Sequence, residues 1–124
     1  MTVISASQAQ RYEMPNVVFR GLASPSRGST ENCTWQFTLA PNSPGLLHQI
    51  TREEIMVVLS GTGVAEIGTE RHTVSKGDAI IIPAYMDFKL SNESDKPFEG
   101  IAVLPVGAQA LIGDEPPFTP PWAL

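Results

Sequence analysis

Short apolar segments, separated by turn residues, recur along the whole chain. Eleven Pro and ten Gly interrupt it every few residues and leave little room for a helix of ordinary length. The segments between them are four to seven residues long and mostly rich in β-branched, aromatic or other apolar side chains, which is typical of strands. The predicted strands are Val17–Arg20, Thr34–Ala40, Leu46–Thr51, Glu54–Ser60, Val64–Gly68, Arg71–Val74, Ala79–Pro83, Phe88–Asn92 and Ile101–Leu104. Many short strands at this spacing predict an all-β sandwich or barrel.

Two of these segments show which side chains face inward. In Cys33–Leu39 every second residue is apolar, as in a strand with one buried face. In Ala79–Ile82 all four residues are apolar, which predicts a central strand packed against the core on one face and against a second sheet, a terminus or a subunit on the other.

Two segments lack the apolar pattern of the predicted strands. Residues 22–32 are polar and rich in turn residues, and they predict a loop. Residues 105–124 contain five Pro, which exclude them from a sheet interior and favour polyproline II, yet they also carry Phe118 and Trp122. We therefore expect one domain over residues 1–124, with a tail at 105–124 that docks on its own barrel or on a partner subunit.

Composition excludes several classes of partner. The 124 residues carry a formal net charge of −5, so there is no basic surface for nucleic acid or anionic membranes. Cys33 is the only cysteine, so an intramolecular disulfide is excluded. No apolar stretch approaches the roughly 20 residues that cross a bilayer, so no membrane-spanning segment is expected. The start, MTVISASQAQ, lacks the features of a secretory signal, so we expect a cytoplasmic protein.

Two stretches, PGLLHQITREEIMVVLSG from Pro44 and GDAIIIPAYMDFKLSN from Gly77, resemble the two sequence motifs of the cupin superfamily. The first motif is His-x-His, three residues, Glu, six residues, Gly. The second is Gly, five residues, Pro-x-Gly, two residues, His, three residues, Asn. The matching residues are His48, Glu54, Gly61, Gly77, Pro83 and Asn92, whereas Ile50, Tyr85 and Phe88 replace a His, a Gly and a His. The resemblance implies a cupin-like β-barrel, or jelly roll, of two antiparallel sheets.

The replacements change what the resemblance implies about a metal. In typical cupins the two His of the first motif, its Glu and the His of the second motif hold one divalent metal ion. Here only His48 and Glu54 remain, and Ile50 and Phe88 have no lone pair to offer. Since a stable site usually needs three or more protein ligands, we expect no metal cofactor. The alternative is one divalent metal ion with His48 and Glu54 as ligands, completed by water or a neighbouring side chain.

The resemblance also implies which side chains point into the barrel. With His48, Ile50, Glu54 and Phe88 inward, the period of two places Met56, Val58 and Leu90 on the same faces. Trp35 and Phe37 are further candidates for the lining. Tyr85 is expected in a turn at the barrel mouth, where it shields the core, gates the pocket or donates its hydroxyl to a ligand. Such a lining is typical of a site for a small, largely apolar organic molecule.

His48 and Glu54 are the candidate catalytic residues. Desolvation is expected to raise the pKa of Glu54 unless a protonated His48 pairs with it, and either state provides a proton donor and acceptor.

Three functions follow as hypotheses. The first is a metal-independent pocket for a small organic molecule, with isomerase, epimerase or lyase chemistry by His48 and Glu54. The second is a metal-dependent oxygenase or isomerase, and the third is a non-catalytic binding or interaction module. In each case the resemblance, the apolar Ile80–Ile82 strand and the tail favour a homodimer.

Overall fold

The computed structural model describes residues 1–124, and all of its paired strands are antiparallel. The larger sheet has the order β1-β2-β3-β10-β5-β8. Its strands are β1 (Gln10–Met14), β2 (Val17–Ala23), β3 (Asn32–Leu39), β10 (Phe98–Pro105), β5 (Glu54–Ser60) and β8 (Ala79–Ile82).

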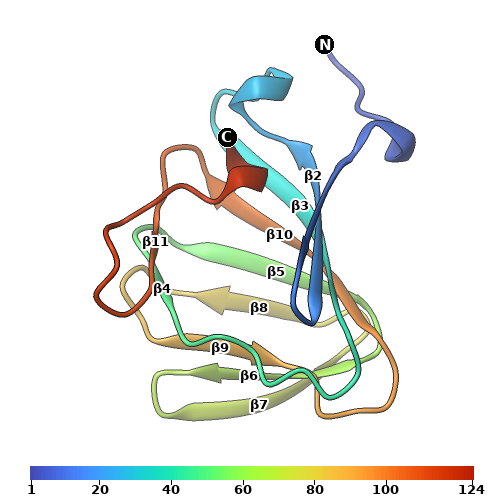
Figure 1. Cartoon of the computed structure of the whole chain (residues 1–124), viewed down its shortest axis with the longest axis vertical. Coiled ribbons are helices and arrows are strands. Elements are labelled where there is room, and N and C mark those ends of the chain that lie inside the picture. The colour runs from blue at the N-terminus through green and yellow to red at the C-terminus, as the bar shows by residue number, and fades with distance from the viewer.

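A three-stranded sheet of order β7-β6-β9 lies at the end of the molecule away from both termini (Figure 1). Its strands are β7 (Glu70–Ser75), β6 (Thr62–Ile67) and β9 (Phe88–Ser91), and β4 (Gln49–Ile50) pairs with β11 (Ala110–Leu111) in a separate ribbon. The helical segments are short 3₁₀ turns: η1 (Ala6–Gln8), η2 (Pro25–Arg27) and η3 (Pro121–Ala123). None of them has the length and apolar character needed to cross a lipid bilayer. The predicted all-β fold of antiparallel sheets is confirmed.

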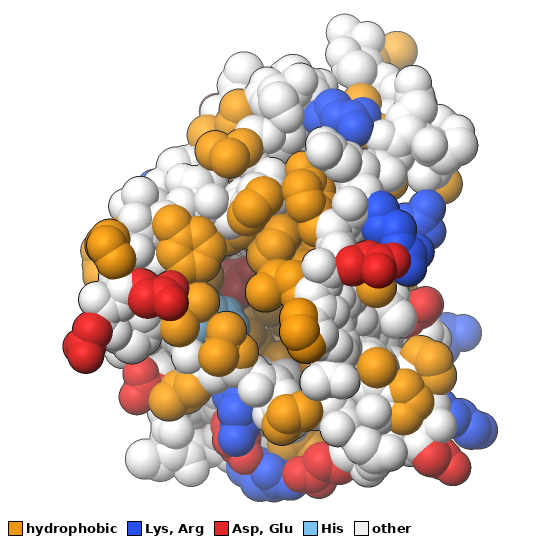
Figure 2. All heavy atoms as spheres, viewed as in Figure 1, with side chains coloured by type: hydrophobic (Ala, Val, Ile, Leu, Met, Phe, Trp, Pro, Cys, Tyr) orange, Lys and Arg blue, Asp and Glu red, His pale blue; other side chains and the backbone are white.

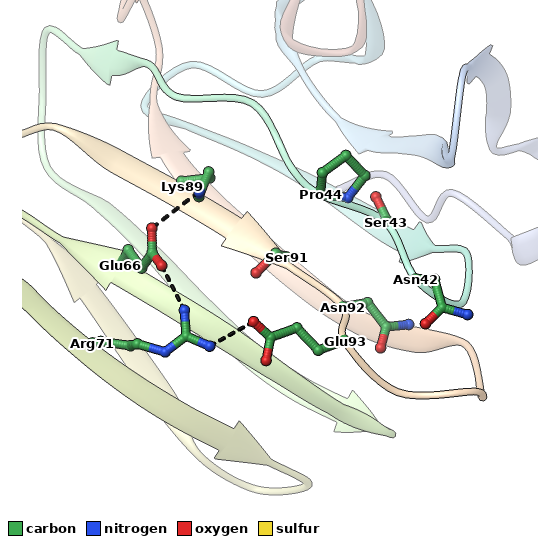
Figure 3. Close-up of a pocket in the computed structure, with 9 residues that line it drawn as sticks. All are labelled: Asn42, Ser43, Pro44, Glu66, Arg71, Lys89, Ser91, Asn92 and Glu93. Atoms are coloured by element: carbon green, nitrogen blue, oxygen red, sulfur yellow. Dashed lines mark hydrogen bonds and ion pairs between the residues drawn. The ribbon is translucent and has the colours of Figure 1, made fainter.

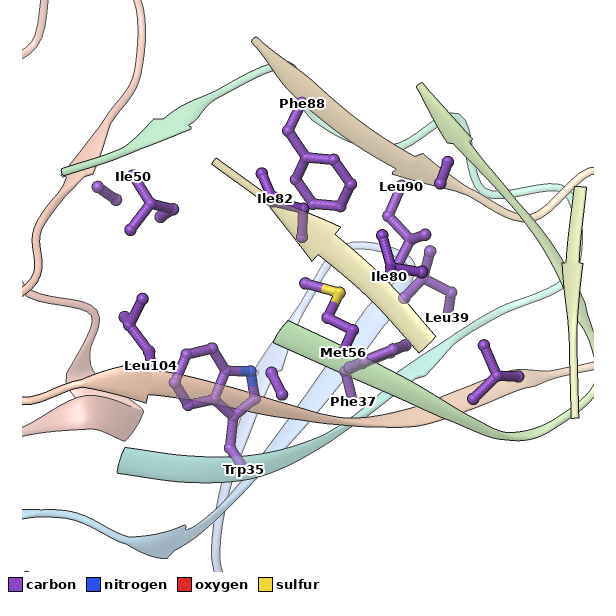
Figure 4. Close-up of a cluster of buried hydrophobic side chains, with 14 of the residues drawn as sticks. Trp35, Phe37, Leu39, Ile50, Met56, Ile80, Ile82, Phe88, Leu90 and Leu104 are labelled. Carbon is purple, nitrogen blue, oxygen red and sulfur yellow. The ribbon is translucent and has the colours of Figure 1, made fainter. Parts of the chain in front are cut away.

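The core lies on the inner face of the six-stranded sheet. In β3, Cys33, Trp35, Phe37 and Leu39 are buried, as the alternation predicted, and β10 alternates in the same way. Figure 4 shows the buried side chains of β3, β5, β8, β9 and β10 pointing toward one another. Because the inner-face residues come from strands far apart in the sequence, this core depends on long-range pairing.

Gly100 allows Phe37 to reach this core. The two residues are register partners on β10 and β3, and a Cβ atom at position 100 would overlap the Phe37 ring. The missing side chain therefore leaves space for an aromatic ring on the neighbouring strand.

Asn92 holds together the turns beyond the end of β9. It is fully buried, and its Nδ2 donates to the carbonyls of Leu39, Ala40 and Lys96 at 3.2, 3.2 and 2.7 Å. Its Oδ1 accepts from the backbone and hydroxyl of Ser94. This motif residue is thus structural, since it satisfies buried backbone groups where the sheets meet.

The prediction for Ala79–Ile82 is wrong in one respect. The segment is β8, but it forms the edge of the six-stranded sheet and pairs with β5 alone. Ile80 and Ile82 are buried, whereas Ile81 points outward and is 60% exposed. The predicted central position is therefore wrong. No other part of the chain covers the outer face, so of the predicted covers a partner subunit remains.

Three strand assignments differ from the pattern. Only Gln49–Ile50 of the predicted strand at 46–51 is paired as a strand, and β1 and β11 were not predicted. The segment of β1 has no clear alternation of apolar and polar residues, and β11 has only two residues. Both strands depend on partners elsewhere in the chain, namely β2 and β4.

The C-terminal tail packs along the barrel through specific contacts. Ala110 pairs with Ile50 of β4, and Trp122 stacks on Phe19 with the ring centroids 3.8 Å apart. Ala123 is buried, and its carbonyl accepts a hydrogen bond from the Cys33 thiol at 3.4 Å. The tail thus contributes aromatic side chains to the inside of the fold.

Candidate functional site

A cavity of about 1040 Å³ opens into the inner face of the six-stranded sheet. Most of its walls are apolar: Trp35, Phe37 and Leu39 of β3 line one side, and Ile50, Phe88 and Leu90 of β4 and β9 line another. Figure 2 looks into the opening, where hydrophobic side chains surround a hollow that contains acidic and histidine atoms. The volume is at the upper end of the range for small-molecule sites.

Glu54 is the buried acidic residue of this cavity. It begins β5, opposite Ile82 of β8, and its side chain is directed inward with Met56 and Val58. Only 2% of the residue is exposed, and its Oε1 has no hydrogen-bond partner. Burial raises the pKa of Glu54 to about 8, so the carboxyl group is mainly protonated at neutral pH.

His48 lies just before β4 and is half-buried at the same cavity. Its Nδ1 is 2.8 Å from the carbonyl oxygen of Leu46, which can only accept a hydrogen bond. Burial lowers the pKa of His48, and the Leu46 hydrogen bond opposes this only in part. The neutral ring therefore carries its proton on Nδ1 and keeps a lone pair on Nε2.

Of the two alternatives for Glu54, the raised pKa caused by desolvation is found and the pairing with a protonated His48 is not. No hydrogen bond or ion pair joins the two side chains, and desolvation is the cause of the raised pKa of Glu54. The site therefore combines a neutral carboxylic acid, which can donate a proton, with a neutral imidazole, which can accept one.

The structure brings most of the predicted lining residues together at this cavity. Trp35, Phe37, Ile50, Met56, Phe88 and Leu90 all line it with His48 and Glu54. Val58 lies outside the lining and is buried in the core instead. Tyr85 is also outside the lining, and it is 62% exposed.

The backbone of Tyr85 explains why the resembled motif has a Gly at this position. Its φ of 59° lies in the left-handed region, which favours the Gly of the resembled motif. Its backbone N–H donates to the carbonyl of Ile50 at 2.8 Å, so this turn links the two motif segments. The strained turn thus belongs to the framework, whereas the side chain points away from the cavity.

The residues present do not fit a divalent metal. His48 and Glu54 are the remaining donors of the resembled set, and no group of three or more His, Cys, Asp or Glu side chains converges in the chain. Three other side chains that could act as metal ligands have partners elsewhere: the Cys33 thiol donates to the Ala123 carbonyl, Glu66 pairs with Arg71 and Lys89, and Asp87 accepts from Gln49. His72 is an exposed residue of β7 near Glu70. Two donors fall short of the three or more that a stable site requires.

Sequence reasoning missed the part of the cavity that comes from the ends of the chain. Residues 11–17, in the β1–β2 hairpin, line its mouth, as do residues 118–122 of the tail. The aromatic residues of the tail were the sequence feature that could have predicted this, because they indicated that the tail docks. No motif, however, connected them with the barrel interior. Their position depends on strand pairing across most of the chain length.

A second, polar depression of about 390 Å³ lies beside the three-stranded sheet (Figure 3). Glu66 pairs there with Arg71 at 2.6 Å and with Lys89 at 3.2 Å, and Arg71 also pairs with Glu93 at 2.5 Å. Its charged groups are thus already matched by neighbours, and the unmatched Glu54 makes the apolar cavity the stronger candidate.

Known proteins place this architecture among related folds. The 1-hydroxy-2-naphthoate 1,2-dioxygenase of Nocardioides sp. (strain KP7) is 33% identical over 67 residues, which are 54% of this chain and 17% of that enzyme. The polyketide cyclase RemF from Streptomyces resistomycificus superposes with a TM-score of 0.74 at 18% identity, covering 85% of this chain and 79% of RemF.

A salicylate 1,2-dioxygenase mutant from Pseudoaminobacter salicylatoxidans, in complex with gentisate, superposes with a TM-score of 0.70 at 14% identity. That match covers 82% of this chain and 30% of the dioxygenase. At such identities the two structural matches establish the fold alone. The sequence profile of the cupin domain matches residues 35–104, more than half of the chain, and this protein therefore belongs to the cupin family.

Proposed function

We propose that the barrel binds a small, largely apolar organic molecule and that Glu54 and His48 act on it as proton donor and proton acceptor. The observation that carries this proposal is the unpartnered Oε1 of Glu54, buried in an otherwise apolar cavity. The reaction class is acid–base isomerisation, epimerisation or elimination by the chain's own side chains.

A buried polar atom without a partner is costly. Leaving such a group unsatisfied typically costs about 1–3 kcal/mol, and most buried polar groups in folded proteins are paired. A ligand oxygen that accepts the Glu54 proton would offset this cost in the bound state. Such unpaired groups are therefore more typical of binding sites than of cores selected only for packing.

The protonation states of the two residues are complementary at neutral pH. Glu54, whose pKa is raised to about 8, has a proton to give, and His48 has a free lone pair on Nε2. A general acid and a general base with pKa values on either side of the working pH are the usual pair for proton transfer at carbon.

The reaction balances with these two groups alone. His48 Nε2 takes a proton from the carbon next to a ligand carbonyl, and the electrons of that C–H bond form the C=C bond of an enol. The carbonyl oxygen takes the Glu54 proton, which leaves a carboxylate and an imidazolium. His48 then returns its proton to another carbon of the enol, or to the opposite face of the same carbon once the ligand has turned over in the cavity, while the Glu54 carboxylate takes back the O–H proton. The product is the isomer or the epimer, and both residues regain their first state.

Exchange of carbon-bound protons tests this function without knowledge of the natural substrate. In heavy water, the protein should accelerate the loss of the α-proton signals of 2-decalone, followed by NMR. Glu54→Gln and His48→Ala should each slow the exchange by about 10²-fold or more, the usual contribution of general acid–base catalysis. Glu53→Gln and His72→Ala are matched controls because both residues are exposed and lie outside the cavity.

Equal exchange in all four variants would contradict the assignment of Glu54 and His48. Saturable binding of 2-decalone without any accelerated exchange would contradict the catalytic part of the proposal and favour the non-catalytic binding module.

A further inference from the structure

The aromatic side chains of this protein are concentrated around one cavity. The chain has five Phe, two Tyr and two Trp, and seven of these nine line the cavity. The lining aromatic residues are Tyr12, Phe19, Trp35, Phe37, Phe88, Phe118 and Trp122, and the other two are Tyr85 and Phe98. Aliphatic residues would suffice for a merely apolar wall, so this distribution indicates selectivity for a flat ligand.

Four of these rings form a contiguous wall made by both ends of the chain. Trp122 is stacked on Phe19 at an interplanar angle of 14°, and it meets Trp35 and Tyr12 edge-on, with centroids 6.4 and 6.0 Å apart. Aromatic ligands gain from offset-stacked and edge-to-face contacts with such rings, beyond the burial of area alone.

The polar groups of the cavity are suited to a neutral ligand. Among the lining residues Arg11 is the only Lys or Arg, and it is an exposed residue that already pairs with Glu13 at 2.7 Å. Toward the interior, Glu54 presents one donor and His48 Nε2 one acceptor. An anionic ligand group would be desolvated there without a cation to balance it.

The size of the cavity favours a ligand larger than a single small ring. At about 1040 Å³, the cavity has room for a molecule of drug size. A larger planar molecule would contact both the aromatic wall and the polar pair.

Resting on the proposed function of the same cavity, we infer that its ligand is a neutral, largely planar molecule of two or more fused rings, at least one of them aromatic, that carries a carbonyl or enol oxygen next to a carbon with a C–H bond. The oxygen accepts from Glu54 or donates to His48, and the rings pack against the wall of Tyr12, Phe19, Trp35 and Trp122.

Three probes of related shape test this inference. Calorimetric titration of the full chain at pH 7 compares 2-naphthol, the saturated 2-decalol and the anionic 1-hydroxy-2-naphthoate. We expect 2-naphthol to bind about tenfold more tightly than either of the others, since stacking and neutrality each favour it. Quenching of tryptophan fluorescence gives a second readout, because both Trp residues line the cavity.

Variants locate the preference on the wall. Phe19→Leu and Tyr12→Leu keep both Trp residues and an apolar surface, and each should weaken 2-naphthol by several-fold while leaving 2-decalol nearly unchanged. The second variant guards against a folding defect in the first, since Tyr12 lies on an edge strand.

The outcomes separate this inference from the function on which it rests. Equal affinities for 2-naphthol and 2-decalol, with proton exchange that still depends on Glu54, would overturn the aromatic preference alone. Tighter binding of the naphthoate than of 2-naphthol would overturn the neutral character of the ligand. Failure of all three probes to bind, together with no accelerated exchange of 2-decalone, would overturn both proposals.

Discussion

His48 and Phe88 face each other across an antiparallel bridge. The backbone N–H of each donates to the carbonyl of the other, at 3.0 and 2.9 Å, and their rings meet edge to face with centroids 5.4 Å apart. These are two of the positions at which the resembled cupin motifs place metal-binding His residues. The framework of the metal site is thus retained, whereas one wall of it has become hydrophobic.

Restoring the missing donors should create a metal site. The double variant Ile50→His and Phe88→His has four donors with His48 and Glu54, and we expect it to retain about one Zn²⁺ per chain after dialysis. Since metal that binds only the folded state stabilises it, added Zn²⁺ should also raise its Tm. Elemental analysis and thermal melts measure the two effects.

Wild type and the matched variant Ile50→Leu with Phe88→Leu should retain substoichiometric Zn²⁺ under the same conditions. Stoichiometric metal in the wild-type protein would show that His48 and Glu54 recruit further ligands, and it would contradict our assignment.

Glu54 should make stability depend on pH. Its pKa is about 4.5 in the unfolded chain and about 8 in the folded protein, so the folded state holds the extra proton between these values. The contribution of Glu54 to stability is therefore greatest below about pH 4.5, falls by up to about 1.4 kcal/mol per pH unit between pH 4.5 and 8, and levels off above pH 8. Glu54→Gln should remove this dependence, as measured by urea denaturation at several pH values.

The neighbouring variant Glu53→Gln provides the control, since Glu53 is exposed. If Glu54→Gln and wild type lose stability in parallel between pH 5 and 8, then Glu54 is ionised in the folded protein and the assignment of a neutral acid is wrong.

The proton exchange of 2-decalone should follow a bell-shaped pH profile. The alkaline limb reports the loss of the Glu54 proton at about pH 8, and the acidic limb reports protonation of His48 below its ordinary pKa of 6.5. NMR exchange rates from pH 5 to 9 measure both limbs. A profile without an alkaline limb would exclude Glu54 as the proton donor.

Gly100 should tolerate no side chain while Phe37 is present. The Cβ atom of Gly100→Ala would overlap the Phe37 ring and crowd the backbone carbonyl oxygen of Val57, so we expect the free energy of unfolding to fall by about 1–3 kcal/mol, of which Phe37→Leu can relieve only the part due to the ring. In the double variant with Phe37→Leu, the loss should be less than the sum of the two single losses, because the smaller side chain relieves the overlap. Denaturant melts of the four proteins complete the cycle, and simple additivity would contradict the steric explanation.

We expect the outer face of the six-stranded sheet to form the interface of a homodimer. Val103, Ile55 and Ile81 are register neighbours across β10, β5 and β8, and Val57 and Leu59 on the same face are 38% and 42% exposed. Light scattering should give about twice 13.4 kDa for the wild-type protein and 13.4 kDa for Ile81→Lys. Thr73→Lys, on the exposed edge strand β7, should remain dimeric; a monomeric wild type would refute the prediction.

The sequence alone determined the strand framework and the residues at its interior. The alternation in β3 and the bounds of β5 at Glu54–Ser60 follow from local periodicity. The resemblance to the cupin motifs implied the inward positions of Ile50 and Phe88, and the period of two then placed Met56 and Leu90 on the same faces. These features are local, because side-chain direction in a strand alternates with a period of two.

Only the tertiary structure decided which groups meet at the cavity. The exposed side of Ile81, the lack of a hydrogen bond between His48 and Glu54, the exposed Tyr85 and the aromatic wall of Phe19 and Trp122 depend on neighbours that are distant in sequence. Whether a group is paired, desolvated or exposed depends on what packs against it. At this cavity the packing includes β1, β2 and the tail, which are distant in sequence from His48 and Glu54.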